Sequence, residues 1–66
     1  MENNIKLWIA KRGYQSKWVA EQLGVSETVF SRWANNKNIP SLHNALRLAD
    51  LLECKVEDLF ELKEGN

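Results

Sequence analysis

The 66-residue sequence contains one cysteine, one histidine and one proline, and its net charge is zero. A single cysteine excludes a disulfide within the chain, and one cysteine with one histidine cannot supply the ligands of a structural zinc site. No apolar run approaches the roughly 20 residues of a membrane-spanning helix, and residues 1–11 lack the layout of a signal peptide. We therefore expect a cytoplasmic protein that holds no metal or other cofactor.

A chain of this length forms one domain at most, because it buries only about 60% of the surface that it exposes when unfolded. Its composition of 44% apolar and 27% charged residues is typical of a folded domain. We place this domain at residues 1–62, followed by a short polar tail at residues 63–66. With so small a core, association with a second copy would add stability.

Charge is unevenly distributed along the chain. Residues 1–38 include six basic and three acidic residues, whereas residues 39–66 include three basic and six acidic residues. A molecule of this kind can turn its basic end toward phosphate and its acidic end away. The alternative is that so few charges are unevenly distributed by chance, so the charge pattern alone does not decide the function.

Apolar residues recur at helical spacing along almost the whole chain, and no stretch alternates as a strand would. This pattern predicts an all-α fold of five short helices around one core. The helices are expected at residues 3–12, 16–23, 27–35, 42–52 and 56–60. Gly13 and Gly24 end the first two helices, while Ser26 and Ser41 begin the third and fourth as N-caps.

The second and third helices are separated only by Gly24-Val25-Ser26. A glycine-bearing turn of this length lets two helices cross steeply, so that the first lies across a DNA backbone while the second enters the major groove. Phe30 and Trp33 are expected in the core. The opposite face of the third helix then carries Glu27, Thr28, Ser31 and Arg32.

The ordered set of these residues resembles the lambda-repressor/Cro-like helix-turn-helix family, also called the Xre family. The resemblance covers about residues 4–62 and is carried by Val19–Ser26, Phe30–Trp33, Asn35, Ile39–Leu42, Leu46–Ala49 and Val56–Phe60. It implies a five-helix domain through which a dimeric regulator binds specific double-stranded DNA. The sequence departs from the family at Ser16, where glutamine usually starts the second helix, and at Asn36 and Glu53, where glycine is common.

Base contacts are expected from the outward face of the third helix, and the resemblance implies the same positions. Arg32 can fork onto guanine O6 and N7, although a solvated surface role is the alternative. Glu27 can accept from a cytosine amino group, or it can merely favour the positive end of its own helix. Thr28 can touch a thymine methyl group or a phosphate, and Ser31 lies on the same face.

Phosphate contacts are expected from helix starts and from the loop after the third helix. They are Arg12, Ser16, Lys17, Asn35, Lys37, Asn38 and Ser41. Ser16 and Lys17 begin the second helix, where backbone N–H groups favour an anion. Arg12 has an alternative role as the partner of a helix dipole.

Leucines at the acidic end exceed what one small core needs. Leu48, Leu51, Leu59 and Leu62 are therefore predicted to form an exposed apolar stripe that joins two copies. A symmetric homodimer would place two recognition helices about 34 Å apart on a palindromic operator. The alternative is a monomer in which these leucines complete the core.

The sequence therefore predicts a DNA-binding transcription regulator, and a repressor in particular, rather than an enzyme. Ser31 lacks a neighbouring His/Asp pair, and no glycine-rich loop could hold a nucleotide. His43 is expected on the surface, and Cys54 is expected to pack as a small hydrophobe. The alternative function is a protein-binding helix-turn-helix module of the antitoxin or anti-repressor type. A non-specific nucleoid protein fits poorly with the zero net charge.

Overall fold

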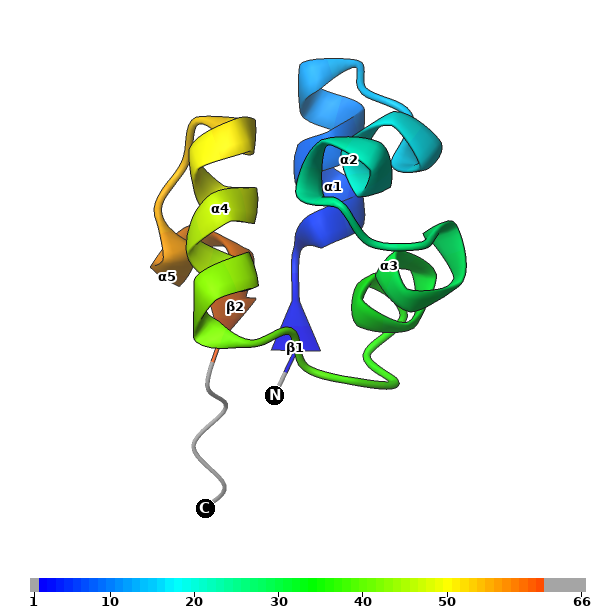
Figure 1. Cartoon of the computed structure of the whole chain (residues 1–66). Coiled ribbons are helices and arrows are strands. Elements are labelled where there is room, and N and C mark those ends of the chain that lie inside the picture. Colours follow the sequence, from blue (N-terminus) through cyan, green and yellow to red (C-terminus); the bar gives the residue numbers. More distant parts are fainter. Residues whose placement is uncertain (1, 62–66) are drawn as a thin grey trace.

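The computed structural model describes residues 2–61 (Figure 1). The helices in this range are α1 (Ile5–Arg12), α2 (Ser16–Leu23), α3 (Glu27–Ala34), α4 (Leu42–Leu52) and α5 (Val56–Leu59). Two short strands, β1 (Glu2–Asn3) and β2 (Phe60–Glu61), lie at the two ends of this range. The five predicted helices are confirmed, and no helix within residues 2–61 is long and apolar enough to cross a membrane.

The strand pair corrects the expectation of a purely helical fold. β1 and β2 pair antiparallel, with Asn3 opposite Phe60, and the Asn4 amide donates to the Leu59 carbonyl at 2.7 Å. Strands of two residues are too short for an alternating pattern to show in the sequence. The first helix begins at Ile5 rather than at residue 3, because the Asn3 side-chain oxygen accepts from the Ile5 amide at 3.1 Å.

All five helices contribute to one hydrophobic core. Phe30 lies fully buried at its centre, and α5 folds back on α4 so that Leu59 closes one side. The buried cluster consists of Ile5, Ile9, Val19, Ala20, Leu23, Phe30, Trp33, Leu48, Ala49, Leu52 and Leu59. Pro40, in the loop that precedes α4, is also buried.

Within residues 2–61, the leucines of the predicted dimer stripe do not form an exposed surface. Leu48 and Leu59 are both 0% exposed, and Leu51 is half-buried against the same core. The placement of Leu48 and Leu59 in an interface is therefore wrong, because these side chains complete the core of the single chain. Leu62 lies outside the described residues.

Two arginines connect helices that are distant in the sequence. Arg47 on α4 donates to the Leu23 and Gln22 carbonyls at the end of α2, at 3.0 Å each. Arg12 at the end of α1 donates to the Leu52 and Glu53 carbonyls at the end of α4, at 2.7 and 3.0 Å. The last carbonyls of a helix lack hydrogen-bond donors within that helix. Each guanidinium supplies donors to two such carbonyls and so holds two helices together.

Candidate nucleic-acid interface

A short turn connects α2 to α3 and sets how the two helices lie relative to each other (Figure 1). Gly24 ends α2 with φ +74°, which favours glycine, and half-buried Val25 then packs against the core. Ser26 begins α3, because its Oγ accepts from the Val29 amide at 3.1 Å. The predicted cap and the predicted turn are both confirmed.

The inner face of α3 is fixed by aromatic packing. Phe30 is 0% exposed and Trp33 is 5% exposed, and their rings meet edge-to-face with centroids 6.1 Å apart. Both residues point into the core, as predicted. Rotation of α3 about its own axis would expose one of these rings to water, so the outer face is equally well defined.

The outer face of α3 presents polar side chains to solvent. Its exposed residues Glu27, Thr28, Ser31 and Arg32 line one shallow, open concavity. The structure therefore brings together all the residues that the sequence nominated for base contact. A helix of this shape fits a major groove about 12 Å wide, and its side chains offer both donors and acceptors.

The loop after α3 contacts the outer face rather than extending away from it. The Asn38 side-chain amide has one orientation in which both its oxygen and its nitrogen find partners. In that orientation, its oxygen accepts from Arg32 Nε at 2.9 Å and its nitrogen donates to the Lys37 carbonyl at 2.7 Å. This contact steadies the Arg32 guanidinium and leaves its two terminal nitrogens for a ligand. Asn35, which directly follows α3, also contacts the outer face. Its side-chain amide nitrogen lies 3.2 Å from the Ser31 hydroxyl oxygen.

The remaining residues predicted to contact phosphate lie at the starts of α2 and α4 and in the loop after α3. Ser16 and Lys17 are exposed at the start of α2, where the N-cap residue Gln15 makes no side-chain capping bond. The first-turn amides of α2 are thus not taken by a capping side chain. Lys37 is exposed, and Ser41 caps α4 by accepting from the Asn44 amide at 3.2 Å.

Comparison with known proteins agrees with this geometry. The model of the Cro/C1-type HTH DNA-binding domain matches residues 4–65. The chain belongs to the Cro/C1-type HTH family. Membership in this DNA-binding family supports double-stranded DNA as a partner of the chain.

Two relatives of the Cro/C1-type chain extend this result. An uncharacterised HTH-type transcriptional regulator of Bacillus subtilis (strain 168), YgzD, is 32% identical over 66 residues, covering 100% of both chains. A crystal structure of a Bacteroides fragilis protein, provisionally described as DNA-binding, is 40% identical with a TM-score of 0.82. That match covers 88% of this chain and 94% of the Bacteroides chain.

One predicted contact of this Cro/C1-type domain needs correction. Arg12 was expected to reach phosphate, but its Nε and Nη2 atoms already donate to the carbonyls that end α4. Its guanidinium also lies over the Trp8 ring, 5.3 Å from the centroid. Arg12 therefore serves as the partner of a helix end, which was its alternative interpretation, although the helix is α4 rather than its own.

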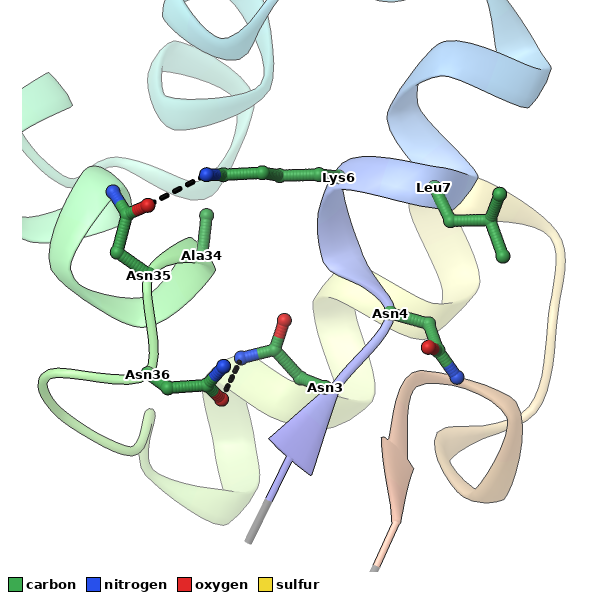
Figure 2. Close-up of a pocket in the computed structure, with 7 residues that line it drawn as sticks. All are labelled: Asn3, Asn4, Lys6, Leu7, Ala34, Asn35 and Asn36. Atoms are coloured by element: carbon green, nitrogen blue, oxygen red, sulfur yellow. Dashed lines mark hydrogen bonds between the residues drawn. The ribbon is translucent and has the colours of Figure 1, made fainter.

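Sequence reasoning missed two residues that hold the end of α3. Asn3 donates to the Trp33 carbonyl at 2.7 Å and to Asn36 Oδ1 at 2.9 Å, and Lys6 Nζ donates to Asn35 Oδ1 at 2.6 Å (Figure 2). Their partners lie 29 to 33 positions away in the chain. No periodicity or motif signals contacts of this range, so only the fold reveals them.

Other residues that the sequence singled out lie apart from the α3 face or have structural roles. Asn36 adopts a left-handed φ of +60°, so the turn tolerates the absence of glycine. Cys54 packs against the core as predicted, and burial raises the pKa of its thiol, with a smaller contribution from Asp58 opposed by Arg12. His43 is exposed.

Proposed function

We propose that this chain is a transcription regulator, and a repressor in particular, that binds a palindromic operator as a homodimer. The observation that carries the proposal is the geometry of α3: Phe30 and Trp33 are buried, while its polar residues face solvent together. The helix-turn-helix family and a relative described as a transcriptional regulator support the same role.

Sequence-specific binding is tested at Arg32. We expect Arg32→Ala to weaken binding to a selected operator by about 1–3 kcal/mol at fixed salt, because a bidentate contact to guanine would be lost. Lys55→Ala removes the same charge at the start of α5 and should leave specific affinity nearly unchanged. Equal effects of the two substitutions would contradict a base-reading role for Arg32.

Phosphate contacts are tested through the salt dependence of binding. Lys17 and Lys37 are proposed to contact the DNA backbone on either side of α3, together with Ser16, Asn35, Asn38 and Ser41. Replacing either lysine by alanine should lower the slope of log K against log salt by about one, and should weaken all sequences alike. A change in the preferred sequence would instead indicate direct base contact.

The homodimer requires a surface other than the leucines first predicted. Ile39, Leu42 and Leu46 are 68, 72 and 52% exposed, although they are large and apolar. They adjoin a groove lined by Ile39, Pro40, Leu42, Ala45, Val56 and Phe60. Because these exposed apolar side chains and the groove lie in one patch, two copies related by a twofold axis can bury their patches against each other.

The size of this patch predicts a weak dimer. Burying such side chains contributes about 1–2 kcal/mol each. Six of them in a symmetric pair therefore contribute about as much as the association cost of about 4–15 kcal/mol. We expect Leu42→Glu to lower dimerisation in sedimentation experiments and to abolish the preference for palindromic over half-site DNA. Leu7→Glu, at a residue 61% exposed on α1, is the matched control.

The outcome also distinguishes the alternative function. If the wild-type chain stays monomeric both free and on DNA, the homodimer is wrong. The same apolar patch then favours a protein-binding module of the antitoxin or anti-repressor type. If Leu42→Glu remains dimeric, the two copies associate through a different surface.

A further inference from the structure

A polar hollow of about 320 Å³ lies between the start of α1 and the end of α3 (Figure 2). It is lined by four asparagines, by Leu7 and Ala34, and by Lys6, which is the only charged residue of the lining. No carboxylate lines the hollow, so nothing there neutralises the ammonium of Lys6. A concave surface with one cation and several amides favours an anionic ligand that accepts hydrogen bonds.

Two side chains in the hollow keep donors that no acceptor within residues 2–61 occupies. The Lys6 ammonium has three protons, and one of them goes to Asn35 Oδ1 at 2.6 Å. Asn36 Oδ1 accepts from Asn3 Nδ2 at 2.9 Å, which leaves both protons of Asn36 Nδ2 without a partner in that range. An ammonium and an amide nitrogen only donate, so together they suit an acceptor such as a phosphate oxygen.

Asn35 itself has no donor left for such a ligand. Its backbone N–H donates to the Ser31 carbonyl, and its Nδ2 donates to the same carbonyl at 2.8 Å and to the Ser31 hydroxyl oxygen at 3.2 Å. Its Oδ1 is an acceptor and is held by Lys6. The backbone contact proposed for Asn35 is therefore made through Lys6, which Asn35 holds in place.

The hollow adjoins the face that is proposed to read DNA. Ser31 lies on that face, and a single side-chain amide, that of Asn35, separates it from Lys6 Nζ. A helix in the major groove has a sugar–phosphate backbone along each side, because the groove is only about 12 Å wide. An ammonium so close to the groove-facing side chains is within reach of a phosphate on one of those sides.

We propose that this hollow is an additional phosphate site, in which the Lys6 ammonium and Asn36 Nδ2 hold one backbone phosphate of duplex DNA. The inference rests on the proposed function, because it needs the outer face of α3 in the groove. Phosphates are the same at every base pair, so this site sets affinity and position on the duplex and leaves sequence preference unchanged.

The first experiment measures duplex binding of the full chain at several salt concentrations. Lys6→Met keeps most of the aliphatic side chain and removes its charge, so the slope of log K against log salt should become shallower by about one. The advantage of the wild type over Lys6→Met should then shrink about 3- to 4-fold between about 50 and about 200 mM salt. Lys6→Arg keeps the charge and should keep the wild-type slope.

Lys11→Met is the matched control, because Lys11 carries the same charge on the same helix. Its Nζ lies over the Trp8 ring, 4.7 Å from the centroid, and it does not line the hollow. We expect Lys11→Met to bind with the wild-type slope. If it changes the slope as much as Lys6→Met does, the charge of α1 acts at long range and the phosphate site is overturned.

The second experiment locates the contact by ethylating single backbone phosphates, which removes the charge of one phosphate at a time. One ethylated phosphate should impair binding of the wild type and should no longer impair binding of Lys6→Met. Asn36→Gly removes the second donor and suits the φ of +60°. It should weaken binding about 3- to 10-fold while the salt slope stays that of the wild type, because a neutral donor is lost.

The outcomes separate this inference from the proposed function. If the wild-type chain binds duplexes without preferring any sequence, specific regulation fails, and the salt experiment on Lys6 still decides the phosphate site. If the chain binds no duplex, both fail. The inference alone is overturned if the wild type selects an operator but Lys6→Met either keeps the wild-type slope or keeps the complete ethylation pattern of the wild type.

Discussion

The two ends of α3 are held in different ways. At its N-terminal end, the Ser26 side chain accepts from the Val29 amide three positions later. Gly24, two positions before Ser26, turns the chain between α2 and α3. At its C-terminal end, local bonds such as that from the Lys37 amide to the Arg32 carbonyl are joined by contacts from the N-terminal part of the chain. Asn3 donates to the Trp33 carbonyl, and Lys6 donates to Asn35, across 30 and 29 positions.

This difference divides the candidate interface into a local part and a tertiary part. The start of α3 forms wherever its own short segment folds, because a cap needs only neighbouring residues. The end of α3 depends on where β1 and α1 lie, and β1 is itself held against β2. Substitutions at the N-terminus of the chain are therefore expected to reach the loop that follows α3, while leaving its first turn unchanged.

The largest expected effect comes from removing Phe30, the buried core residue on which both ends of α3 depend. Phe30→Ala creates a cavity in the centre of the core and should lower the free energy of unfolding by about 3–5 kcal/mol. That loss is comparable to the whole stability of a small domain, about 5–15 kcal/mol. Urea denaturation measures the loss, and amide exchange should rise at both ends of α3 together. Val29→Ala, at a residue 38% exposed on the same helix, should cost far less.

Asn3→Ala separates the two ends. It removes the bonds that Asn3 donates to the Trp33 carbonyl and to Asn36 Oδ1 and the bond that it accepts from the Ile5 amide. At about 1 kcal/mol each, the free energy of unfolding should fall by about 3 kcal/mol. Hydrogen exchange should quicken at the Asn36 and Lys37 amides, which donate to the end of α3, and not at Val29. Equal acceleration at both ends would contradict the separation.

Asn4→Ala is the matched control for this substitution. Asn4 is the adjacent asparagine, but its Nδ2 donates to the Asp58 carbonyl in α5 at 3.1 Å. We expect a loss of stability in denaturant without selective exchange at residues 35–38.

The same division explains how much of the fold was predictable. The helix bounds at residues 16–23 and 42–52 follow from apolar spacing and from caps such as Ser41, which act within one turn. The strand pair and the burial of Leu48 and Leu59 do not follow from apolar spacing or from caps. Leucine spacing identifies an apolar face but not what covers it, and here α5 folds back to cover it.

The candidate site divides in the same way. Its outward residues were predicted because Phe30 and Trp33 fix the opposite face of α3 by helical geometry. Arg12 was misplaced because its partner carbonyls belong to α4, about 40 positions away. The contacts of Lys6 and Asn38 with the site were missed for the same reason: polar side chains carry no periodic signal that identifies their partners.

Ser26→Ala should affect mainly the local end. Loss of the N-cap is expected to cost about 1 kcal/mol of stability. For a domain of this size, that lowers the midpoint of thermal unfolding by about 4–8 °C. Ser26→Asp should recover most of the loss, because a carboxylate also accepts from the Val29 amide and suits the positive end of α3. Failure of aspartate to rescue would mean that the hydroxyl does not act as the cap.

Lys6→Met should have the smallest effect on stability and still report on the tertiary end. Lys6 is exposed, so the free energy of unfolding should stay within about 0.5 kcal/mol of the wild type. The side-chain amide resonances of Asn35 should nevertheless shift in a ¹⁵N–¹H spectrum, because the amide loses the ammonium that orients it. Lys11→Met on the same helix is the control, since Lys11 Nζ lies over the Trp8 ring, 4.7 Å from its centroid, and should leave those resonances in place. Unshifted Asn35 signals in Lys6→Met would mean that Asn3 alone holds the end of α3 in solution.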